Sequence, residues 1–409
     1  MMSDELKKIR QFSEREASRL EEPQKLRELR ADCLRRLEEE FAAAPGSFKE
    51  NTVKKIVENL SASGKDTAST GEGSSPVVAG EQLPEAVEIV PFSDLDGALL
   101  ELVEDYYWAG VRAAGENIYD YLRGALRTGG ELVYVSPGVE LEDPLEITTS
   151  SSESFQSNHL LIVAGEGSEF EFVRTRKSDA EAKVAAENVE IIALENSCLQ
   201  YADFQAYGNE TADSGCLRVR GHEDSRVDLL LGKLGRGDTH YYTCGSLVGQ
   251  NSEIYSNEAV LATGDQRVIS RVTANHRAPE TTEEMITRGV VNNGASGEFN
   301  GKIKVEAGAH TARGSLHERA LMVGDESRAV SVPGLEIDEN DVEVAHSASV
   351  GEIDSRGMFY MKSRGLEEAQ ARRLVIHGFF EVLLEDIENK QIKERLKKMI
   401  DQSLGELDD

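Results

Sequence analysis

The spacing of apolar side chains changes along the chain and predicts regions of different structure. Between residues 4 and 44, apolar residues recur near helical spacing among Glu, Arg and Lys, which predicts an N-terminal helical region over residues 1–60. The next residues are rich in Ser, Gly, Thr and Ala, and we expect a flexible linker over residues 61–93. A second helical rhythm predicts a helical segment over residues 94–130.

From about residue 130 the apolar pattern takes a period of two. Short alternating stretches bounded by Gly, Ser, Asn and Asp predict strands, and no long helical pattern interrupts them until about residue 365. These stretches are ELVYV (131–135), HLLIVA (159–164), EFEFV (169–173), NVEIIAL (188–194), RVDLLL (226–231), RVISRV (267–272) and GKIKVE (301–306). We therefore predict a β core over residues 131–364.

A weak internal repeat indicates how these strands are arranged. Polar turns that contain a serine precede short strands, and the serines recur at intervals of 29, 28, 27, 44 and 31 residues. The serines are Ser168, Ser197, Ser225, Ser252, Ser296 and Ser327. Short strands at a near-constant spacing, with no helices between them, favour the stacked coils of a β-solenoid. A β-sandwich with similar turns is the alternative, because turn-rich β sequences produce chance periods.

Residues 365–409 return to helical spacing and predict a C-terminal helical module. Its apolar stripe includes Phe379, Phe380 and Leu383. Such a stripe needs a cover, which is either the surface of a partner protein or another part of the same module. The expected fold class is therefore mainly β, with a solenoid core between N-terminal and C-terminal helical regions.

Composition narrows the choice of partners. The chain has 409 residues, with 75 acidic and 45 basic side chains and a formal charge of −30. This balance argues against nucleic acid and anionic membranes as partners, because both need a basic face. No apolar run reaches the ~18 residues of a membrane span, and no secretion signal is evident. The four cysteines are widely spaced, so we expect a reducing, cytoplasmic location.

The familiar enzyme signatures are missing from the sequence. It contains no GxxxxGK[ST], no GxGxxG after a strand, no HExxH and no GxSxG, so we do not expect it to hydrolyse ATP or to act as an enzyme. Glu280, Glu283 and Glu284 leave a β-solenoid enzyme acting on polysaccharides as an alternative. Surface solvation explains such acidic clusters more often than catalysis does.

Two of the eight histidines lie in a suggestive context. His317 is adjacent to Glu318, but neighbouring residues of a strand point to opposite faces, which weakens them as a joint chelate. His346 follows the predicted strand DVEVA near the end of the β core and precedes SASVG. A neutral imidazole there can ligate a soft or borderline metal, or it can serve simply as a polar strand residue.

From Gly289 onward the sequence resembles the SufB/SufD family, the non-ATPase components of the SUF iron–sulfur cluster assembly system. The matching segments are RGVVNNGASGEFNGKIKVEAGAHTARG, LMVGDESRAVSVPGLEIDENDVEVAHSASVGEID and MFYMKSRGLEEAQARRLVIHGFF. The clear match covers about residues 275–385, and YVSPGVELEDPLEI (134–147) looks like the family's entry into its β core. The resemblance implies a right-handed parallel β-helix. It also implies a SufC-type ATPase docked on the C-terminal module, and edge-to-edge pairing with a SufB/SufD-type subunit.

Individual positions favour the SufD side of this family. Glu318 stands where SufB carries a cysteine thought to hold nascent cluster, and Ser347 stands where SufB has a glutamate. AHSASVG fits the SufD pattern, with His346 on the SufD histidine. The resemblance makes His346 and Glu318 candidate ligands of a transient iron–sulfur cluster, and Phe379, Phe380 and Leu383 candidate contacts with the ATPase. It also makes a reduced flavin conceivable in the complex.

The expected function is that of an assembly scaffold, which pairs with a second subunit to build or transfer nascent cluster. A purely structural adaptor for the ATPase, without a metal role, is the second alternative. The sequence leaves open whether the pair is a homodimer or a heterodimer.

Overall fold

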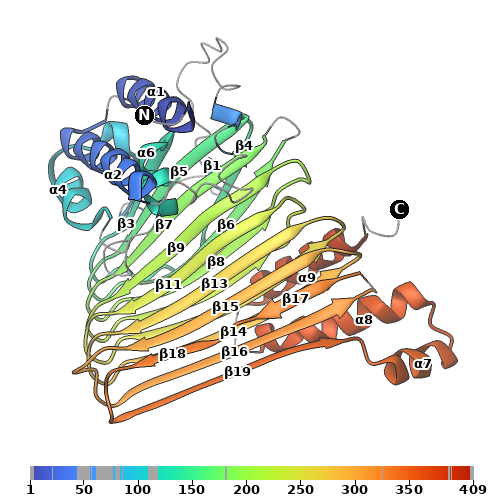
Figure 1. Cartoon of the computed structure of the whole chain (residues 1–409). Helices are drawn as coiled ribbons and strands as arrows, with labels where there is room; N and C mark the ends of the chain where they lie inside the picture. The colour runs from blue at the N-terminus through green and yellow to red at the C-terminus, as the bar shows by residue number, and fades with distance from the viewer. Residues whose placement is uncertain are drawn as a thin grey trace.

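The middle of the chain winds into stacked coils of β-strand, with helices at both ends (Figure 1). In this computed structural model the described residues are 4–20, 22–43, 56, 58–60, 77–78 (backbone only), 83–84, 86–108, 118–179, 182–324, 326–385, 387 and 389–405. The helices are α1 (Asp4–Arg19), α2 (Gln24–Ala43), η3 (Phe92–Asp94), α4 (Gly97–Tyr106), α6 (Ile118–Ala125), α7 (Ser355–Ser363), α8 (Glu368–Glu381), η4 (Val382–Leu384) and α9 (Lys390–Gly405).

The strands alternate between two sheets as the chain proceeds. The nine-stranded sheet contains β1 (Val77–Val78), β4 (Leu145–Ser151), β6 (Glu169–Ser178), β8 (Cys198–Ala206), β10 (Arg226–Lys233), β12 (Glu253–Thr263), β14 (Thr282–Asn292), β16 (Ala312–Val323) and β19 (Val342–Glu352), in that order. The ten-stranded sheet contains β2 (Val87–Pro91), β3 (Gly129–Val135), β5 (Phe155–Ala164), β7 (Val184–Ala193), β9 (Ala212–Gly221), β11 (Thr239–Leu247), β13 (Arg267–His276), β15 (Ser296–Val305), β17 (Arg328–Ser331) and β18 (Gly334–Ile337).

Successive strands of each sheet pair in parallel and in register, apart from the antiparallel additions β1 and β2. A chain that alternates between two parallel sheets in this way forms a β-solenoid, here of about eight turns. The solenoid prediction is therefore confirmed, and the β-sandwich alternative is excluded.

The repeated serines mark one corner of the coils. The hydroxyls of Ser197, Ser225 and Ser252 each donate to the carbonyl oxygen three residues earlier, at 2.7, 2.7 and 2.8 Å. The residues before them, Asn196, Asp224 and Asn251, have φ between 54° and 60°. Asn and Asp tolerate this left-handed conformation better than most side chains do, because they bond to nearby backbone. The corner chemistry thus explains both the serine and the polar residue before it.

The interval of 44 residues has a structural reason. Ser296 and Ser327 lie at strands of the ten-stranded sheet, whereas Ser252 and the earlier serines precede strands of the nine-stranded sheet. The true successor of Ser252 is Thr281, whose hydroxyl donates to the carbonyl of Ala278 at 3.1 Å. The predicted repeat therefore changes corners after Ser252, because a threonine takes the place of the expected serine.

Both outer faces of the solenoid are partly covered by helices. Aliphatic side chains such as Val133, Ile162 and Leu229 fill the space between the sheets. Helices α2 and α6 pack on the first strands of the ten-stranded sheet, and α8, η4 and α9 pack on the nine-stranded sheet (Figure 1).

Two predicted boundaries need correction, and one prediction lies largely outside the described residues. The linker was expected to reach residue 93, but Val87–Pro91 forms β2, because its alternating pattern lets Val87 pack in the core while the backbone pairs with β3. The β core was expected to reach residue 364, but the coil ends at Glu352. Asp354 then caps α7 by accepting hydrogen bonds from two backbone N–H groups. Most of the linker over residues 61–86 is outside the described chain.

Candidate functional site

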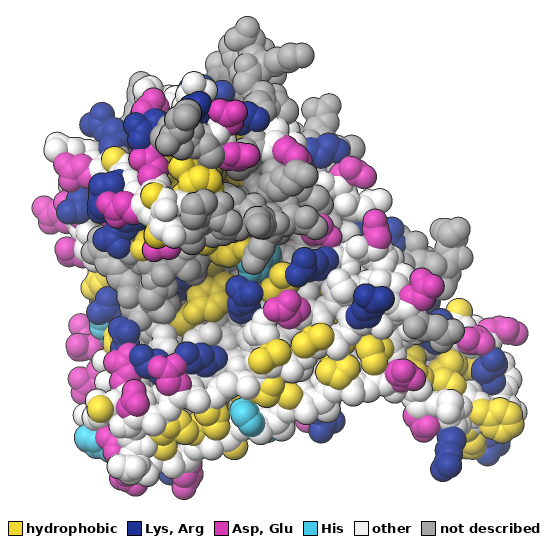
Figure 2. All heavy atoms as spheres, in the orientation of Figure 1, with side chains coloured by type: hydrophobic (Ala, Val, Ile, Leu, Met, Phe, Trp, Pro, Cys, Tyr) yellow, Lys and Arg dark blue, Asp and Glu magenta, His cyan; other side chains and the backbone are white. Residues whose placement is uncertain are grey.

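The C-terminal end of the solenoid is an open edge. Within the described chain, β19 ends the nine-stranded sheet, and β17 and β18 end the ten-stranded sheet. Large apolar side chains are exposed on these strands and the turn between them, namely Val330, Val332, Leu335, Ile337 and Val350. Figure 2 shows hydrophobic side chains gathered over the last strands. An unpaired edge that also exposes apolar side chains is suited to pairing with another chain.

His346 lies on this open edge. In the register of the two last strands of the nine-stranded sheet, His346 stands opposite Leu316, which is fully buried. His346 therefore continues a face that looks into the solenoid in the coil before it, yet it is exposed because no further coil covers it. Its ring has no hydrogen-bond partner in the described part of the chain. The imidazole is free to bind a group that approaches the edge.

Glu318 lies on β16, the strand next to the edge strand β19, and its side chain is buried. Its Oε2 accepts a hydrogen bond from the hydroxyl of Ser331 at 2.6 Å, and its Oε1 has no partner among the described residues. Burial raises the pKa of Glu318, while the bond from Ser331 opposes the rise. Gly301 makes room for this side chain, because a Cβ at that position would lie 2.8 Å from Oε1. The carboxyl group thus points into the solenoid and away from solvent.

The structure brings His346 and Glu318 onto one face and separates His317 from both. Glu318 stands opposite Ala348, two residues along the strand from His346. The ring of His317 instead contacts the hydroxyl of Ser347 on the other face, with Nδ1 and Oγ 2.8 Å apart. The expectation that His317 and Glu318 point to opposite faces of their strand is confirmed. Across the described residues, no group of three His, Cys, Asp or Glu side chains could hold a metal ion.

The predicted docking residues lie mainly inside the C-terminal module. Phe380 and Leu383 are buried against the outer face of the nine-stranded sheet, together with apolar residues of β8, β12 and α9. Phe379 is partly buried, with its ring 5.7 Å from the guanidinium of Arg288. The apolar stripe was expected to be covered either by a partner protein or from within the chain. Phe380 and Leu383 are covered from within the chain. A partner cannot reach either side chain while the module is packed.

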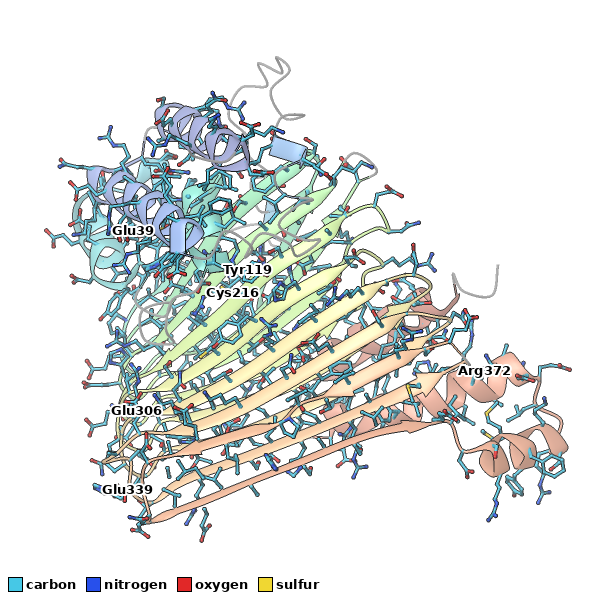
Figure 3. The ribbon with its side chains drawn as sticks, in the orientation of Figure 1. Glu39, Tyr119, Cys216, Glu306, Glu339 and Arg372 are labelled. Carbon is cyan, nitrogen blue, oxygen red and sulfur yellow. The ribbon has the colours of Figure 1, made fainter. Side chains whose placement is uncertain are left out.

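A different apolar surface of the module is exposed. Phe359 and Tyr360 on α7 and Leu374 on α8 expose 75%, 58% and 57% of their surface, and α7 has no buried residue. Beside α7 lies a cavity of about 420 Å³. Its lining includes Met322, Met358, Phe359 and Arg372. Figure 3 labels Arg372, which extends from α8 beside the end of the solenoid. The sequence pattern did not predict this surface, because residues 355–363 were expected to belong to the β core rather than to a helix.

The acidic cluster considered for catalysis does not assemble. Glu283 is buried inside the solenoid, where burial raises its pKa well above the usual value, and both its oxygens lack a hydrogen-bond partner among the described residues. Glu284 follows it on the strand and so points to the opposite face. Glu280 sits in the corner turn, with φ of 60°. Two catalytic carboxyl groups must flank one bond, and these three do not share a site.

Charged side chains also lie inside the solenoid, which the alternating pattern did not predict. The Nε of Arg176 donates to Asp203 at 2.9 Å, and its Nη1 lies 3.4 Å from Asp213. Lys233 pairs with Glu258 on the next coil of the same sheet. Buried charges of this kind are tolerated because they are paired. In an alternating sequence pattern, charged residues of this kind are expected on the solvent-exposed face of a strand.

None of the described helices is long and apolar enough to cross a membrane.

Comparison with known proteins identifies the family. A family model described as "SUF system FeS cluster assembly, SufBD core domain" matches residues 147–379. The iron–sulfur cluster assembly protein SufD of Bacillus subtilis is 30% identical over 324 residues, which cover 77% of this chain and 74% of that protein. A SufBD family protein of Staphylococcus epidermidis is 26% identical over 302 residues, covering 72% of this chain and 65% of the relative.

The family match spans most of the solenoid and part of the C-terminal module, including His346 and Glu318. It agrees with the fold and with the resemblance in the sequence. The chain belongs to the SufB/SufD family of iron–sulfur cluster assembly proteins, and it is SufD-like.

Proposed function

We propose that this chain is a non-ATPase scaffold subunit of a SUF complex, which pairs with a SufB/SufD-type subunit and docks a SufC-type ATPase. The observation that supports it best is the open edge of the solenoid. His346 is exposed there beside unpaired strands and apolar side chains. As part of an iron–sulfur assembly system, such a subunit would work in the cytoplasm.

The partner subunit pairs at the open edge. Strands β17, β18 and β19 each leave one side without a neighbouring strand in the described chain. A second solenoid of the same family can continue both sheets across this edge, which buries Leu335 and Ile337 and removes the aggregation hazard of free edges. Pairing is supported equally for a second copy and for a SufB-type subunit.

The ATPase docks on α7 and the adjoining end of α8. Phe359, Tyr360 and Leu374 expose apolar surface there, and the cavity beside α7 has Lys362 and Arg372 at its wall. Aromatic side chains beside a pocket are typical anchors of protein interfaces. This proposal replaces Phe380 and Leu383 as contact residues and keeps them as the internal support of the docking module.

The cargo of the complex is nascent iron–sulfur cluster. Fe²⁺ accepts nitrogen, oxygen and sulfur ligands, so the imidazole of His346 can bind it together with a thiolate of the partner subunit. Glu318 lies one step inside, where burial favours its protonated form. A carboxyl group in that position can take or release a proton as ligands exchange, but it faces away from the exposed edge.

A co-purification experiment tests the proposal. The tagged chain should retain both the neighbouring SUF ATPase and a SufB/SufD-type subunit, and the complex should hold iron and sulfide after anaerobic reconstitution. Retention of both partners without iron or sulfide would favour the structural adaptor. If neither partner is retained, the scaffold proposal is wrong.

A further inference from the structure

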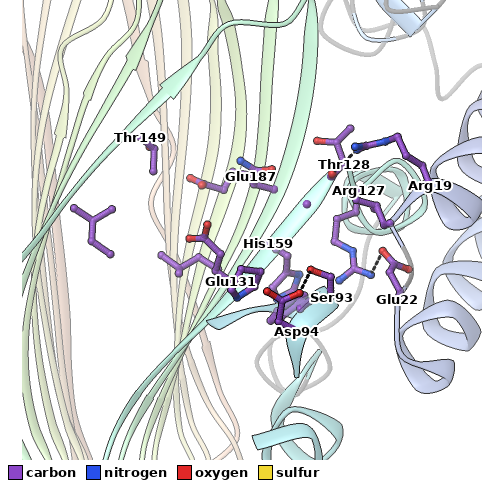
Figure 4. Close-up of a pocket in the computed structure, with 18 of the residues that line it drawn as sticks. Arg19, Glu22, Ser93, Asp94, Arg127, Thr128, Glu131, Thr149, His159 and Glu187 are labelled. Carbon is purple, nitrogen blue, oxygen red and sulfur yellow. Dashed lines mark hydrogen bonds and ion pairs between the residues drawn. The ribbon is translucent and has the colours of Figure 1, made fainter. Parts of the chain in front are cut away.

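A second cavity lies at the opposite end of the solenoid, under the N-terminal helices. It has a volume of about 320 Å³ and lies among α1, η3 and the first strands of both sheets (Figure 4). That volume is room for about ten water molecules. Its charged lining residues in the described chain are Arg19, Glu22, Asp94, Arg127, Glu131, Arg174 and Glu187. It does not border the open edge or the C-terminal module.

Arg127 forms one wall of this cavity and has hydrogen-bond donors that no described residue uses. It is buried, its Nη2 donates to Glu22 at 2.6 Å, and its Nε and Nη1 have no partner among the described residues. Its guanidinium stacks near the rings of Phe92 and Tyr107, with centroid distances of 5.4 and 5.3 Å. Stacking uses the face of the guanidinium plane, so it leaves the in-plane Nε and Nη1 groups available for a ligand.

Arg127 shares its only described carboxylate partner with a second buried arginine. Arg30 and Arg127 are both buried and both pair with the single carboxylate of Glu22. The remaining donors of Arg30 are used by two backbone carbonyls, at 3.1 and 2.8 Å. Among the described residues, two buried cations thus share one carboxylate, and such an arrangement is costly unless another anion lies nearby.

Arg174 lies at the inner wall of the cavity with a similar surplus of donors. Its Nη2 donates to Glu187, while its Nε and Nη1 have no partner in the described chain. Asn158 and Thr149 add polar groups to the lining. Burial lowers the pKa of His159, while the carboxylate of Glu190, 2.9 Å from its Nε2, opposes the fall. A buried N–H group without a protein partner commonly marks a bound water or ion.

Glu131 is the acidic lining residue that would oppose an anion. It faces Arg174 and Glu187, and burial raises its pKa to about 7 against the attraction of Arg174. Glu187 is already paired with Arg174, and Asp94 is exposed at the rim, where it accepts a hydrogen bond from Ser93 at 2.9 Å. A proton on Glu131 therefore removes the main repulsion inside the cavity.

We propose that this cavity binds a small organic anion, whose phosphate or carboxylate group accepts hydrogen bonds from the free N–H groups of Arg127, with Arg174 as a second donor at the inner wall. The site is separate from the edge and module assigned to cluster assembly. It does not depend on the proposed scaffold function.

Calorimetric titration of the full chain with sulfate and with succinate tests the proposal. Sulfate represents the phosphate class and keeps its charge between about pH 6 and pH 8, and succinate represents the carboxylate class. At least one of the two should bind with a stoichiometry of one, and the tighter one assigns the class. Loss of a charge-assisted hydrogen bond in Arg127→Gln should weaken binding ~10-fold or more. Arg313→Gln removes the same charge from an exposed position on β16 and should leave binding unchanged.

Glu131→Gln separates a ligand site from a variant that fails to fold. Because Glu131 is protonated more fully at lower pH, the unmodified chain should bind sulfate more tightly at about pH 6 than at about pH 8. Removing the carboxylate should tighten binding at about pH 8 by several-fold and abolish this difference. A misfolded variant cannot bind more tightly. The proposal is overturned if neither anion saturates the protein, if Arg127→Gln binds as well as the unmodified chain, or if Glu131→Gln leaves the pH dependence intact.

Discussion

Glu318 and His346 lie on the same face of neighbouring strands, two residues apart in register, yet only His346 is exposed. The difference follows from their positions in the stack, because β19 lies over the coil that contains Glu318 and nothing described lies over β19. The last coil thus exposes an imidazole where the coil before it buries Leu316. A partner that covers this coil would contact His346.

A charge placed on the open edge should prevent pairing. Ile337 is partly exposed on β18 and stands opposite Val305 in register. Ile337→Asp should weaken association with the partner subunit by ~10-fold or more, because the carboxylate would lose its water at the interface. Light scattering across a dilution series measures this. Leu374→Asp, the matched change on α8, should associate normally, and weakening of both variants alike would contradict the assignment of the edge.

The two aromatic positions of the C-terminal module should behave differently. Phe359→Asp should abolish retention of the ATPase without loss of stability, because its ring is exposed. Phe380→Ala should cost about 3–5 kcal/mol of stability, because its ring is buried against the solenoid. Co-purification and urea unfolding distinguish these effects. A Phe359→Asp protein that keeps the ATPase would exclude α7 as the dock.

Gly301 should tolerate no side chain. A Cβ there would lie 2.4 Å from Leu316 Cδ2 as well as close to Glu318, and both neighbours are buried. Gly301→Ala should therefore destabilise the last coils by about 1–3 kcal/mol, measured by urea unfolding. Gly351→Ala is the control, because no atom lies within 4 Å of a Cβ at that position. Equal stabilities of the two variants would argue against this packing.

Glu131 should make stability depend on pH. Its pKa is raised from 4.5 to about 7 in the folded chain, so the folded state holds this proton more tightly than the unfolded state does. Stability is therefore lost as pH rises from about 4.5 to about 7, by roughly 2–3 kcal/mol. Glu131→Gln should remove this loss, so that the variant gains stability over the unmodified chain between about pH 4 and pH 8. A stability difference that does not change with pH would contradict the burial of this carboxyl group.

The sequence predicted the solenoid because each corner repeats the same local chemistry. A serine hydroxyl bonds back to the turn at Ser197, Ser225 and Ser252, so the interval between serines reports the length of one coil. The pattern failed at Thr281, where threonine makes the same bond to a carbonyl. The repeat depends on the hydroxyl-to-carbonyl hydrogen bond, which either serine or threonine can make, so a search for serine alone misses Thr281.

The candidate site could be predicted only in part. Alternation along a strand separated His317 from Glu318, and the family resemblance singled out His346. Exposure depends on which coil is last and on where helices pack, so the burial of Phe380 and the exposure of Phe359 did not follow from the helical pattern. The N-terminal cavity joins Glu22 to Arg127, which are 105 residues apart, and no local pattern records that contact.

The iron and sulfide content of reconstituted complexes tests the central claim most directly. The complex of this chain with its partner subunit and ATPase is reconstituted anaerobically, in parallel with complexes that carry His346→Asn or, as control, His310→Asn at the exposed turn before β16. Asparagine keeps some hydrogen-bonding capacity but is a poor iron ligand. We predict that His346→Asn retains both partners and loses most of the iron and sulfide, while His310→Asn matches the unmodified complex. Full iron and sulfide content in the His346→Asn complex would contradict a role for this edge in holding nascent cluster.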